Sequence, residues 1–376
     1  MNILFLDSVD RWTFGGYQNW ISLLAPALVK KGYDITVAGR PDSSFIRRLR
    51  NQKPSPRIME IAISGDFNPA TIYRINRYLD EAAIDIVICD FNKDVRLGGL
   101  AARLNGRTRV LWRLGLNITK NSFMHRFLTP KLIDAVAVPS EGLKKQVVAS
   151  GYISANQVTV IPHGVPDTVK KWTGDNARRE LREKYNLPGD AIVCVTSGRF
   201  VEQKGHRYLL EAAPVVLEKS PQCKFLFLGD GPLEDNLKSR MKELSILESF
   251  IFGGMLDDFE LELAGADIMV HPSIEEPFGF SIIEGMRARL PVIASRVGGI
   301  PEVVIDGETG ILIESKSPEK ITGALLDLLE SPEKLKAMAG AGYNRWHDNF
   351  RLEIMVDRWE NYLLKLVNEE KSDEPA

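Results

Sequence analysis

Two glutamates, Glu276 and Glu284, stand eight positions apart in the stretch EEPFGFSIIEGM (275–286). The first lies in a loop marked by proline and glycine, and the second lies in an apolar run with helical spacing. A carboxylate in apolar surroundings is costly unless another group pairs with it. The neighbours Ile282, Ile283 and Met286 argue against a solvent-facing position for Glu284. Both carboxylates are therefore candidates for ligand contacts, although a charge on the solvent face of the helix is the alternative for Glu284.

Two cations, Arg199 and Lys204, follow the predicted strand 191–197 in the stretch SGRFVEQKGH. They stand where a helix is expected to begin, and a helix N-terminus itself favours anions. The pair would suit a diphosphate. For an isolated Arg-x4-Lys pair, however, two solvated surface charges are the commoner explanation.

Two glycine pairs also follow predicted strands. Gly229 and Gly231 lie in GDGP after the strand 223–228, and Gly15 and Gly16 come after the first strand. Glycine lets backbone amides approach a phosphate or a sugar closely. Taken alone, the GDGP pair is more often just a turn, because the third glycine of a dinucleotide-binding loop is missing. For Gly15 and Gly16 a plain loop is an equally good explanation.

The loop PFGF lies between the two glutamates and contains Phe278, Gly279 and Phe280. We expect Gly279 to turn the backbone amides of this loop outward. Ser281 is the predicted cap of the helix that follows. Glu276 would then project toward a ligand, and Glu284 would reach it from about one helical turn inside.

The residue types also exclude several kinds of chemistry. No Ser-His-Asp order stands out, no Asp-x-Asp sequence occurs, and the histidines do not cluster at metal-ligand spacing. We therefore expect no metal site and no cofactor. The histidines are His125, His163, His206, His271 and His347.

Short β-branched runs alternate with longer segments of helical period, which is the pattern of parallel sheets with crossover helices. Ligands bind such sheets at the carboxyl ends of the strands, where the candidate residues lie. The predicted class is α/β with two doubly wound, Rossmann-like sheets. The expected strands are 2–7, 34–38, 84–89, 108–112, 135–138 and 157–161, then 191–197, 223–228, 249–252, 267–271, 291–294 and 309–313.

A segment rich in proline, glycine and polar residues, IPHGVPDTVKKWTGDN, separates the two strand series and predicts a linker with a cleft beside it. We assign residues 1–165 to the first domain and 166–350 to the second. A helix over 351–367 is expected to pack back on the first domain. The tail 368–376 is expected to be disordered.

Charge is unevenly distributed along the 376 residues. The chain carries a net charge of −2, but residues 1–165 hold 22 Lys and Arg against 13 Asp and Glu, which makes this half +9 and the rest −11. The basic half is therefore expected to meet something anionic. The segment GRPDSSFIRRLRNQKPSPR, which contains Arg47, Arg48 and Arg50, is a candidate for an anionic membrane surface, against the alternative of ordinary solvated charges.

The expected compartment is the cytoplasm, with peripheral attachment to the inner face of the membrane as an addition. The cysteines Cys89, Cys194 and Cys223 sit singly in apolar runs, as in a reducing environment. The first residues lack the pattern of a signal peptide, and no run approaches a membrane span. No nucleic-acid partner is expected.

Several landmarks in order resemble the retaining glycosyltransferases of family 4, which have the GT-B fold of two domains facing across a cleft. These landmarks are the glycine pair before the first helix, IPHGV, GRFVEQKG, LGDGP, EEPFGFSIIEGM, and PVIASRVGGIPEVV followed by GETGILI. They span about positions 15 to 313. The likeness extends to bacterial enzymes of surface-polysaccharide and lipopolysaccharide synthesis.

The resemblance implies a role for each candidate residue. Arg199 and Lys204 would bind the diphosphate of a nucleotide sugar, Glu276 the hydroxyls of the donor sugar, and Glu284 the ribose. Amides of the PFGF loop would touch the sugar or the diphosphate. The glycine pairs and the main chain around Met255 would complete the donor site, with a carbohydrate or lipid-linked acceptor on the first domain.

The implied reaction is metal-independent transfer of a hexose with retention at the anomeric carbon. A nucleotide diphosphate leaves without an acid, so fixed cations suffice to stabilise it. One departure stands out: Arg113, Leu114 and Gly115 occupy the place where many relatives carry a histidine. Arg113 is a candidate contact for the sugar or the acceptor, and His163 is interpreted as a hinge residue.

Two other kinds of function stay open at this point. One is a hydrolase, phosphorylase or epimerase of the same fold. The other is a non-catalytic sensor of sugar nucleotides, or a dehydrogenase using the glycine loops. The dehydrogenase is disfavoured because Gly-x-Gly-x-x-Gly does not follow the first strand. The identities of the sugar, base and acceptor are not encoded in any recognisable pattern.

Overall fold

The computed structural model describes residues 1–8, 16–41, 43–62, 65–116, 122–168, 172, 174–256 and 258–369. The chain forms two compact units. Unit 1 comprises Met1–His163 together with Leu352–Ala376, and unit 2 comprises Gly164–Arg351. The expected domain boundary at 165/166 lies two residues from the boundary between the units. The predicted cleft between the two domains stays a prediction.

Unit 1 is built on a parallel sheet of seven strands in the order β3-β2-β1-β4-β5-β6-β7. β1 lies near the middle and pairs with both β2 and β4. Its side chains Ile3, Leu4, Phe5 and Leu6 are fully buried, as in a strand covered on both faces. The strands are β1 (Asn2–Leu6), β2 (Asp34–Gly39), β3 (Arg57–Glu60), β4 (Ile86–Cys89), β5 (Arg109–Arg113), β6 (Ala135–Val138) and β7 (Val158–Val160).

The helices of unit 1 cover the two faces of this sheet. Right-handed crossovers run from β1 toward β3 and then back from β4 toward β7, so α1 and α2 lie on one face and α4 to α6 on the other. The helices are α1 (Gly16–Lys30), α2 (Ser44–Arg50), α3 (Pro69–Glu81), α4 (Asn92–Asn105), α5 (Phe123–Leu132), α6 (Glu141–Val148) and α15 (Leu352–Asn368).

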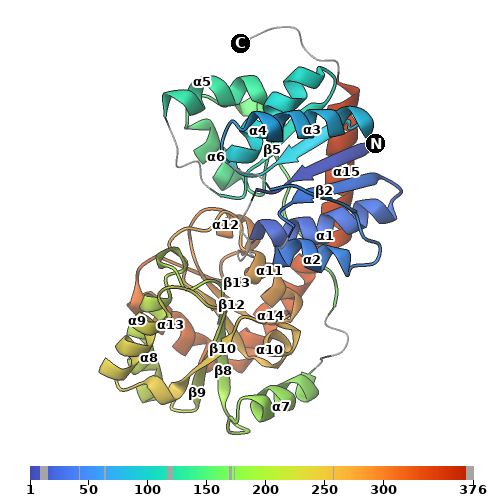
Figure 1. The fold of residues 1–376 in the computed structure, drawn as a ribbon. Coiled ribbons are helices and arrows are strands. Elements are labelled where there is room, and N and C mark those ends of the chain that lie inside the picture. Colours follow the sequence, from blue (N-terminus) through green and yellow to red (C-terminus); the bar gives the residue numbers. More distant parts are fainter. Residues whose placement is uncertain are drawn as a thin grey trace. The chain divides into compact units, whose positions relative to one another are not determined.

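The C-terminal helix α15 packs against α1, as Figure 1 shows in red and blue. Its apolar stripe buries Trp359, whose ring lies 5.0 Å from that of Trp20. Lys31, which follows α1, pairs with Asp357 at 2.7 Å and with Glu360 at 2.5 Å. The segment that is last in sequence therefore completes the core of unit 1.

Unit 2 repeats this architecture with six parallel strands in the order β10-β9-β8-β11-β12-β13. The strands are β8 (Ile192–Ser197), β9 (Cys223–Leu228), β10 (Phe250–Gly254), β11 (Ile268–His271), β12 (Val292–Ser295) and β13 (Gly310–Ile313). The helices are α7 (Gly174–Lys184), α8 (His206–Lys219), α9 (Glu234–Glu243), α10 (Glu260–Gly265), α11 (Phe280–Arg287), α12 (Ile300–Val303), α13 (Pro318–Leu329) and α14 (Pro332–Asn349). The predicted α/β class with two doubly wound sheets is confirmed.

Each sheet has one point where the chain reverses its direction of travel. In unit 1 this point lies between β1 and β4, and in unit 2 it lies between β8 and β11. Open α/β sheets bind ligands in the crevice outside the carboxyl ends of the strands at such a switch point. These two places are therefore where the fold can offer a site.

One strand, β3, was not expected from the sequence. Its four residues include only Ile58 and Met59 as apolar side chains, and both are half-buried at the edge of the sheet. A short edge strand of this kind lacks the apolar run that identifies the buried strands. Two other expectations lie outside the described residues: Gly15 and most of the tail, residues 370–376. No helix in the described ranges is long and apolar enough to cross a bilayer.

Candidate active site in unit 2

The switch point of unit 2 brings Lys204 and Glu276 together. Lys204 ends the 3-10 turn Glu202–Lys204 after β8, and Glu276 lies in the loop after the neighbouring strand β11. Lys204 Nζ donates to Glu276 Oε2 at 2.6 Å. The two side chains are 26% and 10% exposed, so the pair is mostly buried but open on the side of the lysine.

The histidine that ends β11 joins the same network. His271 is buried, and its Nε2 lies 2.9 Å from Glu276 Oε2. Burial lowers the pKa of His271 more than the hydrogen bond to Glu276 raises it, so the imidazole is neutral. Burial alone would raise the pKa of Glu276, but the charge of Lys204 and the bond from His271 outweigh it and hold that pKa below its usual range. Glu276 is therefore a carboxylate at neutral pH.

Only one oxygen of Glu276 is occupied. Lys204 and His271 both bind Oε2, while Oε1 receives no hydrogen bond from a described residue. Lys204 likewise uses one of its three donors. An acceptor oxygen and spare ammonium protons thus lie side by side, a combination that suits a ligand with hydroxyl groups next to an anionic group.

The backbone of Glu276 is fixed by a second loop. Gly299 N donates to the carbonyl oxygen of Glu276 at 3.0 Å. Gly298 has φ +54°, and a Cβ at this position would collide with the same carbonyl oxygen. The GG of the stretch RVGGIPEVV after β12 therefore lets two loops touch, and it holds Glu276 from the main-chain side.

Arg199, the other predicted cation, lies after β8 with its side chain exposed and makes no ion pair within the described residues. The structure places it in the same unit and on the same sheet edge as Lys204. Its guanidinium is available to an anion that approaches this edge. The predicted diphosphate role of both cations stays a prediction.

The PFGF loop leads into α11, which begins at Phe280 after Gly279 in the left-handed conformation with φ +113°. The predicted cap at Ser281 is wrong, because Ser281 already lies inside the helix and its Oγ is 3.3 Å from His271 Nδ1. Phe278 is buried and packs edge-on against Phe350 at 5.8 Å. Its side chain is a core residue, so only its main chain is placed to meet a ligand.

Glu284 lies on α11 and is half-buried. Burial raises its pKa to about 7, against the opposing charge of Arg287. No hydrogen bond from a described residue reaches its carboxylate. A half-buried carboxyl without a hydrogen-bond donor is expensive for the fold, which is consistent with the predicted contact to ribose hydroxyls.

The remaining predicted donor contacts are spread over the same sheet edge, apart from Gly16, which starts α1 in unit 1. Gly229 and Gly231 follow β9, and a Cβ on either would collide with the backbone after β8, at Gly198 and Phe200 respectively. Close packing against this backbone therefore explains why glycine stands at both positions, without any ligand. Met255 follows β10 with 53% of its surface exposed.

Arg113 belongs to unit 1 and is only 3% exposed. Its guanidinium donates to Asp90 Oδ1 at 3.0 Å, lies 3.1 Å from His163 Nε2, and stacks 4.8 Å above the Trp20 ring. The side chain predicted as a sugar or acceptor contact is thus committed to internal partners. His163, the predicted hinge, is the last residue of the first segment of unit 1.

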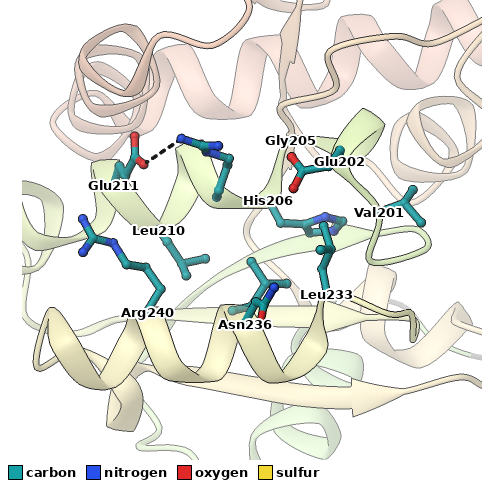
Figure 2. A pocket seen from close by; sticks show the side chains of 11 residues that line it. Val201, Glu202, Gly205, His206, Leu210, Glu211, Leu233, Asn236 and Arg240 are labelled. Carbon is teal, nitrogen blue, oxygen red and sulfur yellow. Dashed lines mark ion pairs between the residues drawn. The ribbon is translucent and has the colours of Figure 1, made fainter.

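A hollow of about 350 Å³ lies next to this site, between α8 and α9. Figure 2 shows Leu210 and His206 of α8 facing Asn236 and Leu233 from the α9 side, with Glu202 and Val201 at one end. None of the predicted ligand-binding side chains lines it. The candidate site is therefore defined by Lys204, His271 and Glu276 at the carboxyl ends of β8 and β11, and the hollow adjoins it.

Known families match both units. The family model of glycosyltransferase family 4 matches residues 14–169, and that of the glycosyl transferases group 1 matches residues 177–345. The chain belongs to these glycosyltransferases. This membership confirms the resemblance inferred from the order of the sequence landmarks.

Curated relatives of this glycosyltransferase include two bacterial proteins. The GDP-mannose-dependent α-(1-6)-phosphatidylinositol monomannoside mannosyltransferase of Mycolicibacterium smegmatis is 31% identical over 212 residues, which are 54% of this chain and 55% of that relative. The putative glycosyltransferase EpsD of Bacillus subtilis is 25% identical over 79% of this chain and 81% of its own length. The chain thus spans about half the length of the first relative.

Solved structures show that the glycosyltransferase has the GT-B fold of its relatives. Anabaena HepE, solved in complex with UDP and glucose, matches with a TM-score of 0.84 at 20% identity over 97% of this chain and 99% of that chain. A glycosyltransferase from Rickettsia africae matches with the same TM-score at 21% identity, over 98% and 99%. At this level of identity the likeness concerns the fold alone.

Sequence reasoning missed two features of the glycosyltransferase site. His271 was dismissed because the histidines form no cluster in sequence, although it directly precedes the loop that carries Glu276. Gly298 and Gly299 were noticed as a landmark without a role. In both cases the partner is Glu276, and the contact exists only after separate strands align.

Proposed function

We propose that this chain transfers a sugar from a nucleotide-diphosphate sugar to a carbohydrate or lipid-linked acceptor, in the synthesis of cell-surface glycans. The observation that carries the proposal is the Lys204–Glu276 pair at the switch point of unit 2, with no described donor on Glu276 Oε1 and with Arg199 exposed on the same sheet edge. Cations for a diphosphate and an acceptor oxygen for sugar hydroxyls are what a nucleotide sugar requires at adjacent points.

The proposed reaction breaks the bond between the anomeric carbon and the diphosphate oxygen and forms a bond from the same carbon to an acceptor hydroxyl. Positive charge develops on the sugar and negative charge on the departing diphosphate, where Arg199 and Lys204 lower the barrier electrostatically. The departing phosphate oxygen takes the proton of the acceptor hydroxyl. Attack on the face that the diphosphate leaves gives retention of configuration.

We further propose that transfer needs no divalent cation, because the two side-chain cations and the loop amides neutralise the diphosphate. Dialysis against EDTA should then leave the rate largely unchanged. Strong inhibition that magnesium or manganese reverses would show that the cations do not suffice. Retention is checked separately by the proton coupling of the anomeric position in the purified product.

The identity of the donor is open, because one relative is named as GDP-mannose-dependent and HepE was solved with UDP and glucose. A panel of UDP-, GDP- and ADP-sugars should include at least one that raises the thermal midpoint, since ligand binding stabilises by mass action. Transfer is then assayed with that donor and acceptors of the carbohydrate and lipid-linked classes. Donor consumption at equal rates with and without acceptor would indicate hydrolysis and overturn the proposal.

A weak attachment to anionic membranes is proposed for unit 1. Helix α2 carries Arg47, Arg48 and Arg50 exposed on the side opposite its buried Phe45, Ile46 and Leu49. Each cation near an anionic lipid surface contributes on the order of 1 kcal/mol, and salt screens this attraction. The attachment should therefore be reversible and selective for anionic lipid.

Vesicle sedimentation tests the attachment. Replacing the three arginines of α2 by glutamine should abolish binding to vesicles with phosphatidylglycerol, while Lys144→Gln with Lys145→Gln on α6 serves as the control on the other face of the sheet. Equal binding of wild type to neutral and anionic vesicles would contradict the proposal. So would anionic binding that survives the α2 substitutions.

A further inference from the structure

The hydrogen bonds of His271 determine which of its nitrogens carries the proton. A carboxylate oxygen only accepts, so Nε2, 2.9 Å from Glu276 Oε2, must be the N–H donor in a neutral ring. Nδ1 is then an acceptor, and Ser281 Oγ lies 3.3 Å from it, in position to donate. Nε2 has a second neighbour, Ser273 Oγ, at 3.0 Å. The ring is therefore oriented from both sides, by α11 and by the loop after β11.

The two side chains that donate hydrogen bonds to Glu276 Oε2, Lys204 and His271, differ in charge and exposure. Lys204 is a cation, 26% exposed, at the sheet edge where a diphosphate would bind. A bound diphosphate would therefore compete with Glu276 for the ammonium protons of Lys204. His271 is 2% exposed and neutral, and its remaining contacts are to serine hydroxyls of the protein. Only the histidine can keep its hold on Oε2 unchanged when an anion attracts the lysine.

From this difference we infer that His271 is a positioning residue for transfer: it fixes Glu276 Oε2 so that Oε1 stays directed at the sugar hydroxyls while Lys204 serves the diphosphate. The inference rests on the proposed function and adds to it a residue on which correct placement of the sugar depends. A displaced Glu276 would still allow the nucleotide to bind but would leave the sugar misaligned, and misalignment of about 1 Å costs on the order of 100-fold in rate.

The neighbouring His206 shows that burial of a histidine here does not by itself create such a role. It starts α8, is 3% exposed, and packs edge-on against Phe200 at 5.1 Å. Its Nδ1 finds no hydrogen-bond partner among the described residues, and burial lowers the pKa of His206 to about 3. His206 is thus a second buried, neutral imidazole of the same unit that makes no bond to Glu276.

The test compares His271→Met, His271→Gln and the matched control His206→Met. Methionine fills a similar volume without a donor, and the glutamine Nε2 can reach the point that the imidazole Nε2 occupies. For each variant the thermal midpoint, the affinity for UDP or GDP without sugar, and kcat and KM are measured. The nucleotide and donor are those that stabilise wild type in the panel above.

We expect His271→Met to lose roughly 10- to 100-fold in kcat with an unchanged affinity for the sugar-free nucleotide. His271→Gln should recover much of this loss, and His206→Met should turn over like wild type. Wild-type turnover in His271→Met would overturn the inference, and so would a loss of nucleotide affinity and thermal midpoint that glutamine does not rescue. If wild type itself transfers no sugar from any donor of the panel, the proposed function fails instead.

Discussion

Each unit holds a cation paired with a carboxylate at the carboxyl ends of two neighbouring strands, β8 and β11 in unit 2 and β4 and β5 in unit 1, yet the two pairs differ in accessibility. In unit 2 the pair is Lys204 and Glu276, at 2.6 Å with 26% and 10% of the side chains exposed. In unit 1 it is Arg113 and Asp90, at 3.0 Å with only 3% and 7% exposed. The carboxyl edge of the sheet therefore carries an open pair in unit 2 and a closed pair in unit 1.

The protonation behaviour of the two carboxyl groups follows this difference. Burial raises the pKa of Asp90 to about 6, and the charge of Arg113 offsets only part of that rise. For Glu276 the balance is reversed, because Lys204 and His271 together outweigh burial. A buried ion pair is weak evidence for net stability but expensive to break, whereas an open pair can exchange partners with a ligand. We therefore assign chemistry to unit 2 and an internal structural role to the pair in unit 1.

The largest effect is expected from Glu276→Ala. Turnover should fall about 10³-fold, which corresponds to roughly 4 kcal/mol, because the sugar loses its acceptor oxygen and Lys204 loses its partner. The thermal midpoint should change little, since the lysine remains partly solvated. The control is Glu275→Ala, the exposed neighbour in the same loop. Near-normal turnover of Glu276→Ala with an unchanged midpoint would remove Glu276 from the site.

Breaking the closed pair of Arg113 and Asp90 should change the stability of the fold more than the binding of a ligand. Arg113→Met leaves Asp90 buried without its cation and should lower the free energy of unfolding by roughly 3 to 5 kcal/mol, measured by urea titration. Adding Asp90→Asn should recover part of this loss, because the uncompensated charge disappears. If Arg113→Met instead kept its stability and lost transfer, Arg113 would be the sugar or acceptor contact predicted from the sequence, and the contrast between the units would break down.

The two cations of unit 2 should affect the transition state more than binding. Arg199→Ala and Lys204→Ala are each expected to cost roughly 2 to 4 kcal/mol of transition-state stabilisation, the scale for one preorganised electrostatic partner. Arg207→Ala is the control, because this arginine is the second residue of α8, is exposed and pairs with Glu211. Normal turnover of both variants at saturating donor would show that neither cation serves the leaving group.

The helices and strands could be predicted well from the sequence, because each is specified by the pattern of apolar residues within its own segment. Buried strands such as Ile86–Cys89 are continuous apolar runs, and helix α15 shows its apolar stripe directly in the sequence. The edge strand β3 lacks that pattern, so it was missed. The candidate residues Arg199, Lys204 and Glu276 could be proposed because each follows a strand and matches a family landmark.

The pairing within the site could not be predicted, because its partners are far apart in sequence. Lys204 and Glu276 are 72 positions apart and meet only because β8 and β11 are neighbours in the sheet. Ser281 has the residue type of a cap, yet the preceding glycine starts the helix and the hydroxyl turns to His271. The burial of Arg113 likewise depends on Asp90, Trp20 and His163, which no short motif connects.

The loop that supports Glu276 gives a smaller effect. Gly298→Ala brings a Cβ against the carbonyl oxygen of Glu276 and should cost roughly 1 to 3 kcal/mol in stability, together with a loss of turnover. Gly307→Ala is the matched control: it also has positive φ, at +76°, but no atom lies within 4 Å of its Cβ position. Equal turnover of the two variants would show that the contact with Glu276 does not matter.

The smallest expected effect concerns Glu284→Gln and its dependence on pH. Because the pKa of Glu284 is raised to about 7 in the folded chain, its contribution to stability is present below the pKa of the unfolded chain and is lost as pH rises through 7. A glutamine at this position does not titrate. The variant should therefore gain stability relative to wild type between pH 5 and pH 8, by on the order of 1 kcal/mol given the partial exposure of the side chain.

The affinity of Glu284→Gln for the donor should change in the opposite direction. A ribose hydroxyl binds a carboxylate better than an amide, so the loss of affinity should be greatest at pH 8. Thermal midpoints with and without donor at both pH values measure the two effects, with Glu275→Gln as the exposed control. A flat difference across this pH range would show that Glu284 is an ordinary solvated carboxylate, and would remove it from the candidate site of unit 2.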